Sequence, residues 1–446
     1  MSNGNIVDAV KRAGVVGAGG AGFPTHVKLA AKVDTYIANG AECEPLLEID
    51  QHLMEKYPEK IVKGLQLGME STGAKKGIIA LKKKYLRAIE AIKGAIKDDE
   101  RLEMFFLDNV YPSGDEFLLV YEILGLLIPE RGLPLDVGVV VNNIGTLINI
   151  ANACEGKPVI TRYVTVTGAV KEPQTLELPI GTPVSVAIEA AGGPVVKPYK
   201  IISGGPMMGR VINSPETAPI TKTSSGLIVL PENHFVITMK EQRMSSKVVV
   251  TKAACIRCQL CTEFCPRFLL GHDLYPDKVM RAIAFGGKTE PKHLTTTFLC
   301  IACWVCTIVC PMILDPCRIN LEVRDNLISE GLQNPHKRAD LQVHQDRKWR
   351  LFPIKRLISR LDLVDYDHPA PLVKRALNVS RVRIPLKQHI GAPAIPTVSV
   401  GDKVSKGDLI GKIPDGSLGA AVHASISGVV EQVTDTVTVS GTAKNI

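Results

Sequence analysis

Apolar and polar positions in the first third of the chain follow the pattern of strands that alternate with helices. Short apolar runs at 33–38 and 137–141 have the length and the β-branched residues of buried strands. Stretches of helical periodicity cover 26–32, 57–72, 85–97 and 116–127. This alternation predicts a parallel α/β sheet whose loops, at the carboxyl ends of the strands, build a site.

The pattern changes after residue 160. Residues 163–168 (YVTVTG) alternate as a strand, a helix is expected over 184–191, and residues 382–446 combine Val, Gly and Pro in short strands. A chain of 446 residues has room for three or four domains. The sequence therefore predicts a multidomain protein with several architectures.

No segment predicts a passage through a membrane. The longest apolar stretch, 117–128, is interrupted by Glu122 and is shorter than the ~20 residues that a spanning helix needs. The first 14 residues lack the apolar core of a signal peptide. The composition, with 45% hydrophobic and 22% charged residues, is typical of a globular protein, and we expect a cytoplasmic location.

Positive charge is concentrated in one segment. The net charge of the chain is +8, and residues 336–383 contain 12 Lys and Arg against 5 Asp, an excess of 7. Such a segment can bind nucleic acid, an anionic membrane or an acidic protein. We prefer the simpler interpretation, a solvated linker, and expect no nucleic-acid partner.

The cysteines give the strongest chemical signal, because eight of the eleven fall in two short runs. Each run has the spacing Cys-x2-Cys-x2-Cys-x3-Cys-Pro, the pattern of bacterial ferredoxins that hold [4Fe–4S] clusters. In two-cluster proteins the fourth cysteine of each run ligates the other cluster. The sequence therefore predicts one cluster on Cys255, Cys258, Cys261 and Cys310, and a second on Cys300, Cys303, Cys306 and Cys265.

Zinc and disulfides account for the two runs less well. Structural zinc uses two Cys-x2-Cys pairs rather than four cysteines in one short run, and disulfides are rare in the cytosol. We interpret Cys43 and Cys317 as buried thiols. Trp304, inside the second run, is interpreted as a packing residue.

Four polar segments of the first third lie at turn-like positions: GAGGAGFPT at 17–25, NGAECEP at 39–45, YPSGDE at 111–116 and NNIGT at 142–146. Glycines such as those of the first segment let backbone amides approach a phosphate closely. The four segments resemble, in the same order, the flavin-site segments of the 51-kDa NADH-binding subunit of respiratory complex I. This resemblance implies a Rossmann-like domain that binds FMN and takes NADH as electron donor.

The resemblance also implies roles for single residues. The flavin phosphate and ring would be lined by Gly17, Gly19, Gly20, Gly22 and Lys28. The ribityl chain and isoalloxazine would contact Asn39, Glu42 and Glu44, Tyr111 would join the cofactor-binding residues, and the phosphate side would be closed by Asn142, Asn143 and Thr146. Phe23 and Glu116 correspond to the residues that stack on and hold NADH, and Glu42 and Glu116 are the expected catalytic residues.

Three positions depart from the pattern of that family. Ala18 replaces an arginine, His26 replaces a glycine, and Asp115 replaces the first glutamate of a pair. We expect the flavin site to tolerate these changes, whereas the affinity or specificity for NADH is more sensitive to them.

The later segments resemble further modules of electron-transport proteins. Residues 159–238 are similar to the SLBB domain, a β-grasp module, of the Rnf-complex C subunit, and 382–446 to the barrel-sandwich hybrid fold of biotinyl and lipoyl carriers. The tip at 420–425 has no lysine to carry a cofactor, so we expect a scaffold. The expected domains are therefore 1–158 (FMN and NADH), 159–238 (SLBB), 245–330 (ferredoxin-like, helical), 331–381 (basic linker) and 382–446 (barrel-sandwich hybrid).

This domain order resembles that of the cobalamin reductases of the propanediol-utilisation bacterial microcompartment. The resemblance implies an NADH-oxidising iron–sulfur flavoprotein that reduces cob(III)alamin within a microcompartment. The implied partners are NADH, a corrinoid or corrinoid-handling enzyme, a shell protein and a second copy of the chain.

Three alternatives stay open at this point. The chain is also compatible with an Rnf-C-like subunit that passes electrons to ferredoxin or membrane partners. A second alternative is an electron relay docked to a microcompartment shell through the segment 336–383. In the third, the microcompartment houses a glycyl-radical enzyme and uses no B12.

Overall fold

The parallel sheet expected in the first third of the chain is present in the computed structural model, which describes residues 3–286, 290–375, 377 and 379–441. Its strands are β1 (Thr35–Gly40), β2 (Lys76–Lys82), β3 (Leu102–Leu107) and β5 (Val139–Asn143), in the order β3-β2-β1-β5 and all parallel. The predicted domains that start at 245, 331 and 382 each include a few residues outside the described set.

Helices cover both faces of this sheet because its side chains alternate between two cores. In β1, Tyr36 and Ala38 enter one core and Ile37 the other. The first core is shared with α1 (Asn3–Arg12), α3 (Ile49–Lys56), α4 (Pro58–Thr72), α5 (Leu86–Ile96) and α7 (Ile144–Cys154). The second is shared with α6 (Glu116–Leu124).

Two of the predicted helices are shorter than expected. The helix expected at 26–32 is α2 (Thr25–Leu29), whose C-terminal cap is Ala30. The helix expected over 116–127 ends at Leu124 because Gly125 takes a left-handed conformation, with φ of 69°, and caps it. The other predicted helices lie within about two residues of α4, α5 and α8 (Val184–Ala190).

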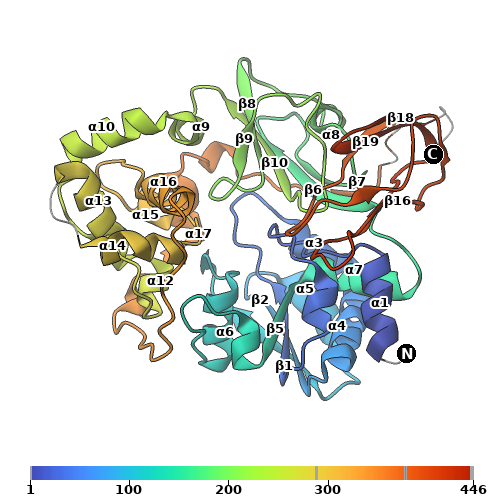
Figure 1. Ribbon diagram of the computed structural model, residues 1–446, viewed down its shortest axis with the longest axis horizontal. Helices are drawn as coiled ribbons and strands as arrows, with labels where there is room; N and C mark the ends of the chain where they lie inside the picture. Colours follow the sequence, from blue (N-terminus) through green and yellow to red (C-terminus); the bar gives the residue numbers. More distant parts are fainter. Residues whose placement is uncertain (1–2, 287–289, 376, 378, 442–446) are drawn as a thin grey trace.

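Three further domains surround the first one (Figure 1). The second has a six-stranded sheet in the order β12-β7-β6-β10-β8-β9, formed by β6 (Thr161–Gly168), β7 (Gln174–Pro179), β8 (Tyr199–Ser203), β9 (Arg210–Ile212), β10 (Gly226–Pro231) and β12 (Leu372–Val373). The cysteine runs lie in a helical domain formed by α10 (Met244–Ala254), α11 (Leu260–Glu263), α12 (Pro266–Leu269), α13 (Pro276–Phe285), α14 (Pro291–Thr295), α15 (Val305–Ile308) and α16 (Pro316–Ser329).

The last domain consists of two small antiparallel sheets, on the side of the molecule away from the helical domain in Figure 1. One contains β13 (Arg381–Pro385), β19 (Thr436–Ser440), β18 (Gly428–Val433) and β15 (Lys403–Val404); the other contains β14 (Ile395–Pro396), β16 (Leu409–Lys412) and β17 (Val422–His423). Within the described residues, no helix is both long and apolar enough to span a membrane.

The interpretation of 331–381 as a solvated linker is wrong for much of its length. Its strand β11 (Phe352–Pro353) pairs with β4 (Val110–Tyr111), and β12 extends the sheet of the second domain. The helix α17 (Ile354–Arg360) buries Ile354, Leu357 and Ile358 in a core shared with Tyr111 and Trp304. The many charges of this segment concealed an apolar helical face in the sequence.

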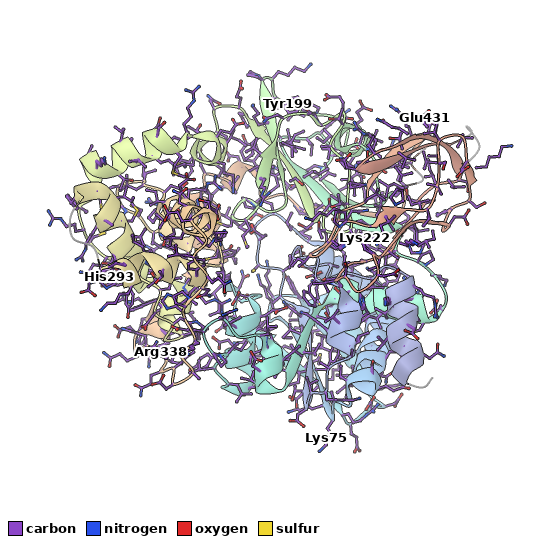
Figure 2. The ribbon with its side chains drawn as sticks, viewed as in Figure 1. Lys75, Tyr199, Lys222, His293, Arg338 and Glu431 are labelled. Atoms are coloured by element: carbon purple, nitrogen blue, oxygen red, sulfur yellow. The ribbon has the colours of Figure 1, made fainter. Side chains whose placement is uncertain are left out.

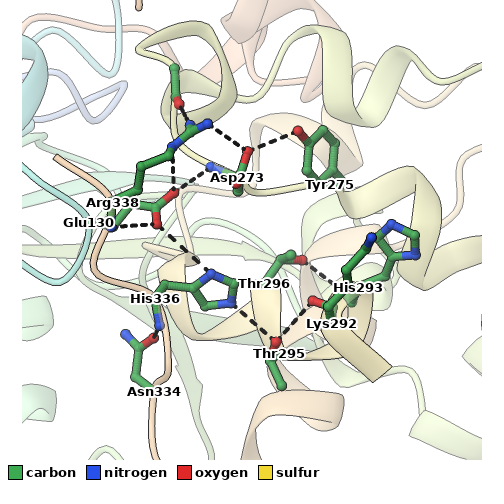
Figure 3. Close-up of polar contacts among 11 residues, drawn as sticks. Glu130, Asp273, Tyr275, Lys292, His293, Thr295, Thr296, Asn334, His336 and Arg338 are labelled. Carbon is green, nitrogen blue, oxygen red and sulfur yellow. Dashed lines mark hydrogen bonds and ion pairs between the residues drawn. The ribbon is translucent and has the colours of Figure 1, made fainter. Parts of the chain in front are cut away.

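The beginning of the same segment is fixed by a buried carboxylate (Figure 3). Glu130 accepts hydrogen bonds from the backbone N–H of Asp273, at 2.7 Å, and of Arg338, at 3.2 Å. Arg338 also forms an ion pair with Asp273, at 3.3 Å. The basic segment therefore joins the first domain to the helical domain instead of crossing solvent.

Lys222 lies where the first, second and last domains meet, near the middle of the molecule (Figure 2). Its Nζ donates to the carbonyl oxygens of Gly14 and Ala421, both at 2.6 Å. Gly14 has a φ of 66°, and a Cβ there would lie 2.1 Å from the Ala421 oxygen. The hairpin tip at 420–425, which has no lysine of its own, thus packs against Lys222 of the second domain.

Burial lowers the pKa of Lys222 to about 7, from ~10.4 in an unfolded chain. Between those values the unfolded chain keeps a proton that the folded chain releases, so the contribution of Lys222 to stability rises with pH. We expect the melting temperature of wild type to rise relative to that of Lys222→Met between pH 7 and pH 9. Melting curves of the matched variant Lys406→Met, at an exposed lysine, are the control; parallel pH profiles for wild type and Lys222→Met would contradict the prediction.

Candidate functional site

The eight clustered cysteines surround two separate cavities. The first cavity is lined by Cys255, Cys258, Cys261 and Cys310, and the second by Cys265, Cys300, Cys303 and Cys306. Each cavity therefore combines three cysteines of one run with the fourth cysteine of the other run. These are the two sets predicted from the sequence, and their role as cluster ligands stays a prediction.

The two runs have the same backbone conformation. Arg257 and Gln259 in the first run and Ala302 and Trp304 in the second all have φ between 57° and 66°, at equivalent positions after the first cysteine. In the second run this turn brings the backbone N of Ala302 to 3.4 Å from Sγ of Cys300. Hydrogen bonds from N–H groups to ligand sulfurs tune the potential of an iron–sulfur cluster.

The chemistry of the cysteine cavities fits a bound metal cluster. Burial raises the pKa of Cys265 to about 12, so a thiolate there needs a bound cation beside it. The arrangement of four cysteines around a cavity fits a [4Fe–4S] cube.

Cys317 is a fifth cysteine in the second cavity, which the sequence alone indicated only as a buried thiol. Its sulfur lies within hydrogen-bonding reach of the sulfurs of Cys300 and Cys306. The neighbouring Asp315 places it there by accepting from Trp304 Nε1, at 3.0 Å, and from Thr307 Oγ1, at 2.7 Å. Asp315 is in turn paired with the buried Lys247, at 2.5 Å.

A much larger cavity, of about 540 Å³, opens at the carboxyl ends of β1 and β5. This volume is typical of a site for a cofactor of flavin size. Eleven of the residues predicted for this site line it: Gly17, Gly19, Phe23, Lys28, Asn39, Glu42, Glu44, Tyr111, Glu116, Asn142 and Asn143. Gly20, Gly22 and Thr146 do not line it.

Those three residues lie around the glycine loop without facing the cavity. Thr146 is buried and its Oγ1 accepts from the N–H of Ala18, at 2.9 Å. Gly22 faces the second and last domains, since a Cβ there would lie 2.9 Å from Thr223. Gly20 has a φ of 106° and open space around it. Thr146 therefore supports the cavity without facing it.

Among the described residues, three cationic side chains line the cavity, those of Lys28, Arg162 and Arg267, and the sequence motifs indicated only Lys28. Lys28 Nζ pairs with Glu116, at 2.8 Å, and donates to the carbonyl of Val141, at 2.9 Å. Arg162, from β6 of the second domain, donates to the carbonyl of Ala18. The positive charge that Ala18 lacks relative to the complex I pattern is thus supplied from another domain. A lone arginine in an alternating strand was the only sequence signal for it.

Two carboxyl groups of the cavity, those of Glu42 and Asp50, lie near Arg162. Glu42 accepts from the N–H of Asp50, at 3.0 Å, and Asn143 Nδ2 donates to Asp50, at 2.7 Å. Burial, followed by the charge of Asp50, raises the pKa of Glu42 well above its usual range. Burial also raises the pKa of Asp50 to about 6. Together the two carboxyl groups therefore carry less than two full negative charges near neutral pH. The sequence motifs did not indicate Asp50.

Glu44 links the cavity to the second domain. Its two carboxylate oxygens accept from the N–H groups of Met207 and Met208, both at 2.9 Å. Gly205 is required beside it, because a Cβ there would lie 2.1 Å from a Glu44 oxygen. Met207 is buried, as expected of a packing residue, whereas Met208 is 54% exposed and lines the cavity.

The cavity also touches the second cysteine cavity directly. Cys303 lines both, and the Tyr111 hydroxyl donates to the carbonyl of Cys303, at 2.9 Å. Four residues further on, Asp115 forms an ion pair with the buried Arg267, at 3.1 Å, two residues after Cys265. Arg267 stacks on Phe117, 3.4 Å from the ring centroid. The segment 111–117 therefore holds the large cavity against both runs.

Comparison with protein families agrees with this architecture. Four family models match the chain: the Nuo51 FMN-binding domain over residues 10–152, the SLBB domain over 163–211, the 4Fe-4S dicluster domain over 254–315, and the RnfC barrel sandwich hybrid domain over 370–446. FMN and [4Fe–4S] clusters are therefore the cofactors of this fold.

Curated relatives match most of the chain. Cobalamin reductase PduS of Citrobacter freundii is 44% identical over 96% of this chain and 95% of its own length, and that of Salmonella typhimurium is 43% identical over 98% and 96%. The C subunit of the Na⁺-translocating ferredoxin:NAD⁺ oxidoreductase complex of Acetobacterium woodii is 41% identical, over 58% of each chain. A solved NAD⁺-reducing [NiFe]-hydrogenase aligns with 21% identity, a TM-score of 0.47, and coverage of 75% of this chain and 63% of its own.

The position of Cys317 generates a prediction for the second cluster. A thiol that donates to a ligand sulfur stabilises the extra electron of a reduced cluster, so its loss lowers the reduction potential. We expect Cys317→Ala to shift one of two cluster potentials to a more negative value, and Cys317→Ser, which keeps a donor, to shift it less. Potentiometric EPR titration measures both, with Cys154→Ala on α7 as the control. Unchanged potentials in Cys317→Ala would contradict the hydrogen bond.

Proposed function

Because this chain belongs to the PduS family of cobalamin reductases, we propose that it oxidises NADH and passes the electrons to a corrinoid, cob(III)alamin. The observation that carries the proposal is the position of Cys303, which lines both the flavin-sized cavity and the second cysteine cavity. One residue thus separates the place where a hydride is accepted from the place where single electrons are carried.

The large cavity has side chains suited to FMN and to NADH. Lys28 and Arg162 supply positive charge for a phosphate, and the glycine loop supplies close backbone approach. FMN accepts a hydride as an electron pair and releases electrons singly. Phe23 and Glu116, at the cavity wall, would position the nicotinamide nucleotide, and the Lys28 ion pair holds Glu116 in place.

The two cysteine cavities differ in their surroundings, which supports an order between them. Cys265, Cys303 and Cys306 of the second cavity are buried, whereas Cys258 of the first is exposed. Electron transfer falls steeply with separation, so the second cavity, against the flavin-sized cavity, serves as the entrance. The first cavity, at the surface, serves as the exit.

The location and the protein partners of this chain rest on its family alone. We propose that it works in a bacterial microcompartment, next to a corrinoid-handling enzyme and a shell protein. The segment 336–383 is a poor docking arm, because α17 and β11 within it are packed between domains. Co-purification of shell proteins with the intact tagged chain tests this location; a chain recovered free of them from cells that assemble microcompartments would contradict it.

Single-cysteine variants test the function and the order together. We expect Cys265→Ala and Cys258→Ala each to reduce the iron content from about eight to about four per chain. In anaerobic titrations with NADH, Cys265→Ala should still bleach its flavin but leave the remaining cluster oxidised. Cys258→Ala should reduce its remaining cluster, yet lose the reduction of cob(III)alamin by at least tenfold.

Two outcomes would count against this proposal. A protein without flavin, or one whose flavin NADH does not reduce, would contradict the function itself. Rapid cluster reduction in Cys265→Ala, with no reduction in Cys258→Ala, would contradict only the order of the two cavities.

A further inference from the structure

The surface around the first cysteine cavity is unusually apolar for an exposed region. Ile256 is 59% exposed, Phe285 47%, Met312 40% and Ile313 54%, and Cys258 is exposed among them. Ile256 and Met312 line the mouth of the cavity itself. We call Ile256, Arg257, Phe285, Met312 and Ile313 the exit surface.

Arg257 gives this surface its charge. Its guanidinium lies over the ring of Phe285, 4.2 Å from the centroid, and it has no ion pair within the described part of the chain. Among the residues that the structure describes, the only acidic one that lines the cavity is Asp277. It is buried, its carboxylate accepts a hydrogen bond from Thr262 Oγ1, at 2.6 Å, and it forms an ion pair with Arg281, at 3.1 Å. As far as the described residues go, the exit surface therefore presents the uncompensated cation Arg257 within an apolar rim.

This composition is that of a protein interface rather than of a small-molecule site. Aromatic, Met and Arg side chains are enriched at the centres of protein interfaces, where Lys, Glu and Asp are depleted. Interfaces between redox proteins are small and form transiently, which suits a compact patch such as the exit surface. The apolar side chains exclude water, and Arg257 selects the charge of the partner.

We propose that the exit surface docks a protein electron acceptor that presents an apolar face with a carboxylate opposite Arg257. This inference rests on the proposed function, because it assigns the partner of the exit cavity. A corrinoid reduced by this chain would then receive its electrons while held by such a protein, without binding inside this chain.

Two charge-opposed acceptor proteins test the proposal, because a protein cannot enter the flavin-sized cavity. The probes are rubredoxin, a small acidic iron protein, and cytochrome c, a basic one. We expect Arg257→Glu to slow the reduction of rubredoxin about tenfold at low salt and to accelerate that of cytochrome c. Both effects should fade as salt is raised. Met312→Ser should slow both acceptors, because it removes apolar contact without changing charge.

The matched control is Arg87→Glu, the same charge reversal at an exposed arginine of α5 in the first domain. We expect this variant to match wild type with both probes, because it leaves the exit surface unchanged. A response of Arg87→Glu equal to that of Arg257→Glu, or equal rates in all variants, would overturn the proposal.

A binding measurement separates this inference from the proposed function. The dissociation constant for rubredoxin, measured with the oxidised chain and no NADH, should rise about tenfold in Arg257→Glu. Bleaching of the flavin by NADH should be unchanged in that variant. A loss of NADH-dependent bleaching would count against the proposed function. Unchanged rubredoxin affinity with normal bleaching would count against the docking surface alone. Self-association of the wild-type chain that Arg257→Glu abolishes would also count against it, because the surface would then bind a second copy.

Discussion

The attachment of segment 111–117 to the two cysteine runs is the contact on which the rest of the molecule depends. The Tyr111 hydroxyl binds the backbone of Cys303, and Asp115 pairs with Arg267 next to Cys265. Arg267 is buried, so opening this contact would leave its charge without a carboxylate partner, which is unfavourable. Electron transfer requires a short, fixed separation, and these two bonds fix the separation of the flavin-sized cavity from the second cysteine cavity.

The other domains complete the cavity instead of merely surrounding it. The second domain contributes Arg162 to one wall and binds Glu44 through the amides of Met207 and Met208. The last domain contributes Ile390 to the lining of the same cavity. Arg162 of the second domain therefore places a positive charge beside Ala18, at the position where the complex I pattern has an arginine.

Patterns of neighbouring residues in the sequence predicted the features that depend on residues close together in the chain. The spacing of the cysteine runs predicted the two mixed sets, and the resemblance of the four polar segments to a known family predicted ten residues of the large cavity, with Lys28 as an eleventh outside the segments. Arg162, Arg267 and Cys317 act across domains or helices, and no spacing in the sequence connects them to their sites. The segment around α17 was misread because charged residues flank Ile354, Leu357 and Ile358, whose spacing is that of a buried helical face.

A cryo-EM density map of the anaerobically purified protein, recorded with NADH, would show directly whether the flavin lies against the second cysteine cavity. We expect a flavin in the cavity beside Cys303, a [4Fe–4S] cluster on Cys265, Cys300, Cys303 and Cys306 next to it, and the other cluster on Cys255, Cys258, Cys261 and Cys310 at the surface. Clusters that are each held by one run alone, or a flavin that lies nearer to the first run than to the second, would contradict this electron path.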